Sequence, residues 1–292
     1  MQLLDGGMFA FSAFHALKDR RALPLTWQVP LMVAKVVEDT GDGVAVCWNG
    51  ERQWKRDRMP GYRPRLEIWQ TATRRDFELM LRVLAGLGVL QFRTDEHEAD
   101  EILAMLVHAL EGEEPVLIRS DDKDFMQLLS PTTWMFGRVR GLVKPDDVPG
   151  VLGVRPGLVA DLLALQGDAV DGIPRVASDA RALRLLRDHG RISDWIASPI
   201  AREELGDGVD QLKLNLELTD LGRTAVGDRP PPRSRMATRR VISSRTQVSV
   251  KAFPICRAPT SMGCSKRESL RRERCTSAGC SDAADRPGRP RL

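Results

Sequence analysis

The sequence of 292 residues predicts an α/β fold in which a mostly parallel central sheet is flanked by helices. Three short apolar runs have the length and composition of buried strands: Gln2–Leu4, Val44–Trp48 and Val116–Arg119. Longer segments that follow them place apolar residues at helical spacing. Because strands separated by helices form parallel βαβ units, these two observations together indicate a covered parallel sheet.

The helices are predicted from apolar periodicity. In Asp76–Leu87 the apolar stripe consists of Phe77, Met80, Leu81, Leu84 and Leu87. In Glu98–Leu110 it consists of Ile102, Leu103, Leu106, Val107 and Leu110. Further helices are expected at about 157–166, 179–189 and 209–221.

Segment 50–75 interleaves basic residues with aromatic ones. The basic residues include Arg52, Lys55, Arg56 and Arg63, and the aromatic residues are Trp54, Tyr62 and Trp69. Such a surface can hold a phosphate backbone and stack on bases. A solvated charged loop with aromatic rings tucked beneath it accounts for the same composition, and both interpretations stay open.

The net charge of +4 is distributed unevenly along the chain. Residues 1–221 are acidic on balance, whereas residues 222–292 are strongly basic. From Gly222 onward, a run of prolines and scattered glycines give no sustained apolar period, so we expect this tail to be disordered. It could add nonspecific affinity for DNA through counterion release, or it could be an artefact of gene prediction.

Cysteine use and hydropathy indicate a cytoplasmic protein. The tail cysteines match no CxxC spacing, and Cys47 lies in an apolar run, so neither a zinc site nor a disulfide framework is indicated. The N-terminus lacks a basic region and carries Asp5 within its apolar run, which is not typical of a signal peptide. No stretch approaches about 18 uncharged apolar residues, so no membrane span is expected.

Acidic residues gather at the ends of the predicted elements. Asp5 follows the first strand and Asp122 follows the third, and the carboxyl ends of parallel strands meet at one edge of a sheet. Glu98 and Glu101 are three residues apart and therefore share a helix face. The full set of these carboxylates is Asp5, Glu98, Asp100, Glu101, Asp122, Asp124, Asp168 and Asp171.

Converging carboxylates repel one another and raise one another's pKa values unless a cation lies between them. Oxygen-rich sites suit Mg²⁺ or Mn²⁺, and two such ions about 3.5–4 Å apart support phosphodiester hydrolysis. Each acidic group taken alone has an ordinary explanation. Asp168 and Asp171 could be turn or cap residues, Glu98, Asp100 and Glu101 a solvated helix start, and Asp121, Asp122 and Asp124 an ordinary surface turn. The joint pattern favours a metal site.

Four segments resemble the 5′-nuclease (flap endonuclease) family, which includes the 5′→3′ exonuclease domain of bacterial DNA polymerase I and phage flap endonucleases. Leu3–Leu17 resembles the opening of that domain, and Glu98-Ala-Asp-Glu-Ile resembles its Glu-Ala-Asp-Asp-Val/Ile motif. Ser120–Leu129 is similar to its Asp-Lys-Asp-Leu-x-Gln-Leu segment. Ala164–Pro174 is similar to its Ala-Leu-x-Gly-Asp-x-x-Asp-Asn-Ile-Pro motif. The resemblance runs from residue 1 to about 220.

The resemblance implies a domain organisation. Residues 1–150 would form a PIN-like nuclease domain, with an arch over single-stranded 5′ ends at about 50–75. Residues 151–221 would form a helical DNA-binding region, a degenerate helix-hairpin-helix, and residues 222–292 would follow as a basic tail.

The resemblance also implies residue roles. All eight carboxylates would be ligands of a two-metal site, with Asp5 and Asp122 central to catalysis. Lys55, Arg56 and Arg63 stand at basic positions of the arch, where they would steer phosphates or stabilise transition-state charge. We assign Lys55 and Arg56 to catalysis and expect nucleic-acid contacts from Arg52, Lys55, Arg56, Tyr62 and Arg63.

The sequence departs from the family pattern at several positions. Asn49 stands where the family has Asp at a strand end; it could offer one uncharged oxygen to a metal, or it could simply cap the next segment. Glu101 replaces an Asp, and Gly172 replaces an Asn. The segment Ile173–Leu183 lacks the glycines of the family's hairpin, which binds duplex phosphates through backbone N–H groups.

These patterns predict a metal-dependent 5′→3′ exonuclease or flap endonuclease that is monomeric and acts on DNA flaps or RNA primers. Its partner would be DNA or an RNA–DNA hybrid with 5′ single-stranded ends, and no membrane. The alternative is a catalytically weakened relative that binds branched nucleic acid. Asn49 and the altered hairpin favour the alternative. The surviving carboxylates favour the enzyme, because a pure binder gains nothing from anions that face a polyanion.

Overall fold

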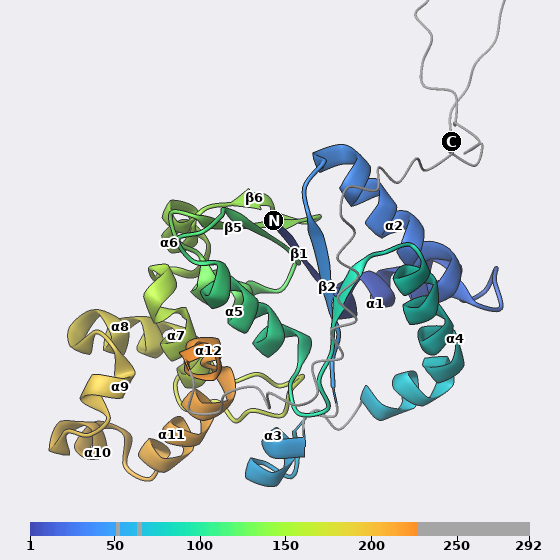
Figure 1. Cartoon of the computed structure of the whole chain (residues 1–292). Coiled ribbons are helices and arrows are strands. Elements are labelled where there is room, and N and C mark those ends of the chain that lie inside the picture. The colour runs from blue at the N-terminus through green and yellow to red at the C-terminus, as the bar shows by residue number, and fades with distance from the viewer. Residues whose placement is uncertain (51–52, 63–65, 227–292) are drawn as a thin grey trace, which may run out of the picture. The chain divides into compact units, whose positions relative to one another are not determined.

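The computed structural model describes residues 1–50, 53–62 and 66–226, with the side chains of 66–72 and 224–226 left aside (Figure 1). All of the described residues belong to one compact unit. The strands of the described part are β1 (Gln2–Asp5), β2 (Val44–Cys47), β3 (Leu90–Phe92), β4 (Val116–Arg119), β5 (Thr133–Gly137) and β6 (Gly141–Val143).

Helices connect and follow the strands. Those that accompany the sheet are α1 (Gly6–Leu17), α2 (Pro24–Thr40), α3 (Gln53–Arg58), α4 (Leu66–Gly86), α5 (Ala99–Leu110) and the 3₁₀ helix η1 (Lys123–Leu128). Those that follow it are η2 (Pro145–Asp147), α6 (Val148–Leu152), η3 (Pro156–Leu158), α7 (Val159–Gln166), α8 (Asp179–His189), α9 (Ile192–Trp195), α10 (Pro199–Leu205), α11 (Gly208–Thr219) and α12 (Leu221–Val226).

The strands form one six-stranded sheet in the order β3-β2-β1-β4-β5-β6. Only β6 runs antiparallel to its neighbour among these strands; the other pairs are parallel. In register, Asp5 lies beside Cys47 and Leu4 lies beside Arg119. The carboxyl ends of β1, β2 and β4 therefore meet at one edge, and the predicted α/β fold with a mostly parallel sheet is confirmed.

Helices cover both faces of the sheet, as Figure 1 shows with α5 on one side and α1, α2 and α4 on the other. Successive strand residues point to opposite faces, so each strand contributes to two cores. Leu4 and Val46 are buried with residues of α1, α2 and α4. Leu3 and Ala45 are buried with α5. Burial on both faces explains why these strands read as continuous apolar runs in the sequence.

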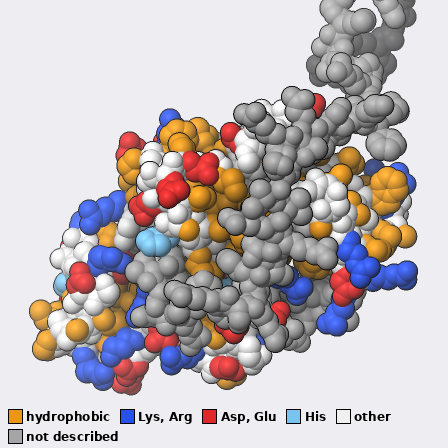
Figure 2. Space-filling view, in the orientation of Figure 1, with side chains coloured by type: hydrophobic (Ala, Val, Ile, Leu, Met, Phe, Trp, Pro, Cys, Tyr) orange, Lys and Arg blue, Asp and Glu red, His pale blue; other side chains and the backbone are white. Residues whose placement is uncertain are grey.

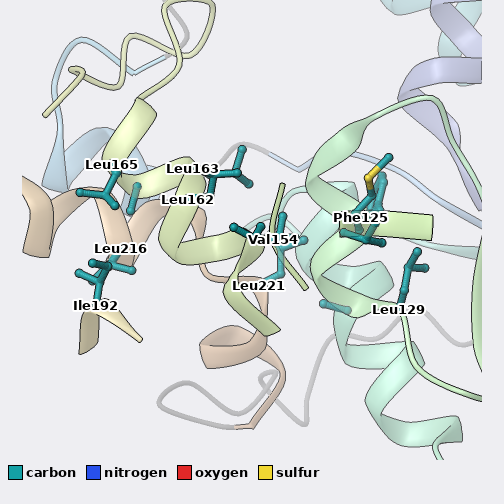
Figure 3. Packing of buried hydrophobic residues seen from close by; sticks show 14 of the residues in the cluster. Phe125, Leu129, Val154, Leu162, Leu163, Leu165, Ile192, Leu216 and Leu221 are labelled. Carbon is teal, nitrogen blue, oxygen red and sulfur yellow. The ribbon is translucent and has the colours of Figure 1, made fainter. Parts of the chain in front are cut away.

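The core beneath α5 continues into the C-terminal helices. Figure 3 shows Leu162 and Leu165 of α7 close to Ile192 of α9 and Leu216 of α11. The same cluster includes Phe125 of η1 (Figure 3), which lies directly after the acidic segment at the end of β4. The helical region is thereby packed against the element that carries Asp122 and Asp124.

The structure contains strands that the sequence did not predict. The run Leu90–Phe92 forms an edge strand with partly exposed side chains, and Thr133–Gly137 buries only alternate residues. Neither is a continuous apolar run, which is the pattern that revealed the other three strands. The predicted helix at Asp76–Leu87 begins earlier, at Leu66, whereas the predicted helix at 179–189 has the expected bounds.

The prediction that packed structure ends at Gly222 is wrong by a few residues. Helix α12 extends from Leu221 to Val226 and packs against α5 and η1. Leu221 is 3% exposed, and its backbone N–H donates to Oε1 of Gln127 at 2.9 Å. The rest of the predicted tail, residues 227–292, lies outside the described residues.

Within the described ranges, no single helix is both long and apolar enough to cross a membrane. The bent pair Pro145–Leu152 and Pro156–Gln166 meets the same length and composition test only when its two helices are taken together.

Candidate metal centre

Asp5 ends β1 and begins α1, and both of its carboxylate oxygens have a fixed donor. Oδ1 accepts the backbone N–H of Met8 at 3.2 Å, the usual bond of an N-cap Asp, and Oδ2 accepts the hydroxyl of Ser120 at 2.8 Å. The helix can start immediately because the next residue is Gly6, where a Cβ would collide with the Trp48 ring. Burial raises the pKa of Asp5 to about 6, and the carboxylates of Asp122 and Asp100 add to the rise.

Asp122 and Asp124 follow β4 at the start of η1. Asp122 Oδ1 accepts the backbone N–H of Asp124 at 3.0 Å, which caps this short helix, and Asp122 itself is exposed. The Oδ1 atom of Asp124 is buried and accepts no hydrogen bond from any described residue. Burial, together with nearby Asp122, Asp100 and Asp171, raises the pKa of Asp124 well above its ordinary value.

Three acidic residues lie at the start of α5, with Glu98 as its N-cap and Asp100 and Glu101 in its first turn. Glu98, Asp100 and Glu101 each offer a carboxylate oxygen, and these oxygens lie within 4.8 Å of one another. Glu98 and Glu101 are 0% and 1% exposed, and Glu101 Oε2 accepts the backbone N–H of Glu98 at 2.8 Å. Burial raises the pKa of Glu101 to about 7, although the ammonium of Lys55 opposes the rise.

Asn49 follows β2 and contacts the same helix. Its Oδ1 accepts the backbone N–H of Ala99, the first residue of α5, at 2.8 Å. A Cβ placed at Gly7 would lie 3.2 Å from Oδ1 of Asp5 and 3.5 Å from Nδ2 of Asn49, so the two side chains flank the same point. Asn49 thus caps a helix and also lies beside Asp5.

The segment around α3 contacts the acidic cluster from within the protein. The Nζ atom of Lys55 lies 2.7 Å from Oε2 of Glu98 and 3.7 Å from Oε1 of Glu101. The hydroxyl of Tyr62 donates to the same Glu98 oxygen at 2.8 Å. Burial by itself lowers the pKa of Lys55, but Glu98, Asp100 and Glu101 together raise it well above its ordinary value. Lys55 therefore acts as a counter-ion of the cluster.

The loop after α7 contributes Asp168 and Asp171. Oδ1 of Asp168 accepts the backbone N–H groups of Val170 and Asp171 at 2.7 and 3.2 Å, which folds the loop into a tight turn. Gly172 has a φ of +77°, and a Cβ there would lie 2.7 Å from the carbonyl oxygen of Gly61. Glycine at this position lets the loop approach the segment that carries Tyr62.

One pocket joins these segments. Among the residues that line it are Lys55, Tyr62, Asp100, Asp124, Asp168 and Asp171. Asp5 and Asp122 interact electrostatically with this group through Asp100 and Asp124, and Glu98 and Glu101 adjoin it through Asp100. The structure thus gathers all eight predicted carboxylates in one neighbourhood, with Asn49 at its border.

Of the predicted basic residues, only Lys55 lines this pocket in the part of the chain that the structure describes. Lys55 is 2% exposed, and Arg56 lies half-buried on α3 but is not among the residues that line the pocket. Arg52 and Arg63 lie outside the described residues. Tyr62 is buried, so its ring is tucked beneath the surface as the second interpretation of segment 50–75 expected. Acidic and basic side chains are interspersed on the face that Figure 2 shows.

Sequence reasoning missed the role of Ser120 and Asp121. Both belong to the motif at the end of β4, but only the two aspartates after them were assigned a role. Ser120 is fully buried and bridges Asp5 to the backbone of Asp122. Ser120 is a small hydroxyl residue directly after β4, and Asp121 and Asp122 follow it. This placement is the sequence signal that could have identified Ser120.

The donor set fits a divalent cation. It consists of carboxylate oxygens, which hard divalent ions prefer. Two of its buried atoms, Oδ1 of Asp124 and Oε1 of Glu101, accept no hydrogen bond from the described part of the chain. The raised pKa values of Asp5, Glu101 and Asp124 show that burying these charges without a cation is unfavourable. The acidic cluster can therefore hold a metal ion.

Comparison with known protein families identifies the family of this chain. The family model of the 5′-3′ exonuclease, N-terminal resolvase-like domain, matches residues 1–149. The chain belongs to this family.

Related sequences and structures agree with this membership. The chain is 28% identical over 230 residues to the thermostable DNA polymerases I of Thermus filiformis and Thermus aquaticus, which covers 74% of this chain and 28% of each polymerase. It is 28% identical over 251 residues to DNA polymerase I of Rhizobium leguminosarum, covering 75% of this chain and 24% of that protein. The chain thus spans about a quarter of the length of these relatives.

Two structures of bacteriophage T5 proteins share the fold. The T5 5′-exonuclease with divalent zinc ions bound has a TM-score of 0.65 at 20% identity, covering 77% of this chain and 91% of that chain. The T5 flap endonuclease in a pseudo-enzyme-product complex with DNA and metal ions has a TM-score of 0.63 at 19% identity, covering 78% and 93%. At these identities the likeness shows a common fold.

Proposed function

We propose that this protein is a divalent-metal-dependent 5′→3′ exonuclease or flap endonuclease that hydrolyses phosphodiester bonds near the 5′ ends of DNA flaps or RNA primers. The observation that carries the proposal is the convergence of eight carboxylates, several of them buried, in a chain of the 5′-3′ exonuclease family. Such a concentration of buried negative charge has no value for binding a polyanion unless cations accompany it.

Mg²⁺ or Mn²⁺ is the proposed cofactor, with two ions in the site. The residues that would hold them are Asp5, Glu98, Asp100, Glu101, Asp122, Asp124, Asp168 and Asp171, with Asn49 as an uncharged neighbour. When bound, such ions supply an activated water and stabilise the charge of the leaving oxygen.

The protein's own residues would orient the carboxylates and the nucleic acid. Tyr62 and Lys55 both hold Oε2 of Glu98, which fixes the first turn of α5. Arg56, half-buried on the neighbouring helix α3, is the described basic residue that we assign to a substrate phosphate, with Arg52 and Arg63 as further contacts. We expect a cytoplasmic monomer whose partner is DNA or an RNA–DNA hybrid with a 5′ single-stranded end. Residues 1–150 would be its nuclease domain and 151–221 its helical region.

One observation favours a second candidate, a relative that binds branched nucleic acid but cuts poorly. Asn49 lacks the carboxylate of the family, and its Oδ1 is already engaged by the N–H of Ala99 at 2.8 Å. An amide in that position weakens the attraction for a cation at the Asp5 end of the site.

A cleavage assay separates the two functions. The purified full chain would be incubated with 5′-labelled flap, nicked and RNA-primed duplexes in the presence of Mg²⁺, Mn²⁺ or EDTA. We expect cleavage near the 5′ end with either metal and none with EDTA. Tight binding to the flap duplex without cleavage at any metal concentration would establish the second candidate instead.

A further inference from the structure

We propose that Ser120 and Asp121 are positioning residues, through which the turn between β5 and β6 fixes the carboxylate of Asp5 and the backbone of Asp122. The inference rests on the proposed function, because it concerns the geometry of the same metal site. It assigns a role to two side chains that are neither metal ligands nor substrate contacts.

Ser120 uses its hydroxyl to join two strand ends. Its Oγ donates to Oδ2 of Asp5 at 2.8 Å and accepts the backbone N–H of Asp122 at 3.1 Å. A serine hydroxyl has a single proton, so the bond to Asp5 uses its whole capacity as a donor. The side chain is 0% exposed, so no water competes for these bonds. At the acidic site, this hydroxyl group therefore links the carboxylate at the end of β1 to the backbone at the start of η1.

Asp121 connects the same segment to the β5–β6 turn. Its Oδ1 accepts the backbone N–H of Val139 at 2.9 Å, and its carbonyl oxygen accepts a hydrogen bond from Nη1 of Arg140 at 3.1 Å. Its Oδ2 lies 3.5 Å from Nε of Arg138. The carboxylate of Asp121 thus binds the turn between β5 and β6. These contacts keep it apart from the neighbouring carboxylates of the acidic site.

Gly137 allows the turn to approach this closely. A Cβ at position 137 would collide with Oδ1 of Asp121 and would lie 2.9 Å from the carbonyl oxygen of Ser120. The backbone of the turn therefore rests directly on residues 120 and 121. A continuous series of contacts runs from Gly137 and Val139 through Asp121 and Ser120 to the carboxylate of Asp5.

Partners of this kind orient the groups that bind a metal. A ligand carboxylate that is free to rotate loses entropy when an ion binds, whereas one held by a neutral donor is already placed. Asp5 is held from both sides, by Met8 and by Ser120. Removing the Ser120 hydroxyl should therefore weaken ion binding at the Asp5 end of the site.

The test measures Mn²⁺ binding to the full chain by titration calorimetry in the absence of nucleic acid. We expect Ser120→Ala to weaken Mn²⁺ affinity roughly 10-fold or more, and Ser120→Thr, which keeps the hydroxyl, to restore most of it. Asp121→Ala should weaken it to a smaller extent, and Asp121→Asn should behave like the wild type because Oδ1 remains an acceptor for Val139. Ser130→Ala is the matched control, since among the described residues its hydroxyl bonds only to Thr132, within the turn before β5.

Flap cleavage by the same variants separates positioning from a general loss of structure. Ser120→Ala should raise the Mn²⁺ concentration required for half-maximal rate while the KM for the flap substrate stays unchanged. Should Ser120→Ala fold poorly, the Asp121→Ala and Asp121→Asn pair carries the test. Mn²⁺ affinity equal to that of the wild type in Ser120→Ala, or in Asp121→Ala should the first variant fold poorly, would overturn the inference.

The outcome is separable from that of the proposed function. If the wild type cuts flap DNA but Ser120→Ala binds Mn²⁺ as tightly as the wild type, the nuclease assignment stands and the positioning role is overturned. If no substrate is cut but Mn²⁺ affinity depends on Ser120 and is rescued by Thr, the positioning role stands and the nuclease assignment fails.

Discussion

The ammonium group of Lys55 lies 2.7 Å from the carboxylate of Glu98, and these side chains are 2% and 0% exposed. A buried ion pair gains Coulomb energy but loses the hydration of both charges, so its net contribution to stability can be small. Removing one partner is nevertheless costly, because the other charge then stays buried without a counter-charge. Here Lys55 also lies 3.7 Å from Glu101. The positive charge of Lys55 compensates the buried carboxylates at the start of α5.

Replacing Lys55 with Met should therefore destabilise the metal-free protein and strengthen its binding of metal. We expect a loss of about 3–5 kcal/mol in urea unfolding without metal, because Glu98 would stay buried without its counter-charge. Mn²⁺ affinity should rise, because the cation that competes for the acidic cluster is gone. Lys35→Met, which removes a surface lysine, is the control and should change neither quantity appreciably. A Lys55→Met protein that binds Mn²⁺ more weakly than the wild type would contradict this account.

Replacing Asp122 with Ala should abolish cleavage and leave the fold nearly intact. The side chain of Asp122 is exposed, so its loss removes a proposed ligand and the cap bond to Asp124 but no buried packing group. Affinity for flap DNA, measured in Ca²⁺ or EDTA, should be equal to that of the wild type or slightly higher, because one anion that faces phosphate is lost. Cleavage by Asp122→Ala at a rate near that of the wild type would remove Asp122 from the site.

The metal-free protein should lose stability as the pH rises from about 4 to about 7. Burial raises the pKa of Asp5 to about 6 and that of Glu101 to about 7, so the folded state holds protons that the unfolded state releases. Unfolding then releases protons in this window, and higher pH favours the unfolded state. Thermal melting in EDTA at pH 5 and pH 7.5 measures the effect, and Asp5→Asn should flatten it. A melting temperature that rises over this range in EDTA would show that other groups dominate.

Replacing Asn49 with Asp should lower the Mg²⁺ concentration needed for half-maximal cleavage. Aspartate keeps an oxygen for the N–H of Ala99, so the cap of α5 survives, and the added charge attracts a cation beside Asp5. Cleavage rates would be measured across a Mg²⁺ titration for both proteins. Superimposable curves would mean that Asn49 serves only as a helix cap.

Two truncations locate the end of the packed chain. Ending the chain after residue 220 removes Leu221, which is 3% exposed, and should cost about 2 kcal/mol or more of unfolding free energy. Ending it after residue 226 should leave the melting temperature unchanged, because the sequence of 227–292 has no apolar period with which to form a core. The second truncation should also weaken nonspecific DNA binding and flatten its dependence on salt, as fewer phosphates are neutralised. Equal melting temperatures for the two truncated chains would show that α12 adds nothing.

The sequence by itself determined the α/β class, the central strands and the set of acidic residues. Val116–Arg119 is a continuous apolar run, and the helix that starts near Glu98 has a clear stripe, so both can be read from a few neighbouring residues. Once three parallel strands are predicted, geometry requires that Asp5 and Asp122 meet at their carboxyl edge.

Only the tertiary structure decided which of these groups touch. The bond from Ser120 to Asp5 joins residues 115 apart, and that from Lys55 to Glu98 joins residues 43 apart. The local sequence around Lys55 does not show whether this lysine faces phosphate or is buried against two glutamates, because the surrounding segment is basic in either case. The bond of Asn49 to Ala99 and the strands β5 and β6 likewise depend on partners elsewhere in the chain. Local periodicity records which residues are buried, whereas hydrogen bonds and ion pairs form between segments that meet only when the whole sheet has assembled.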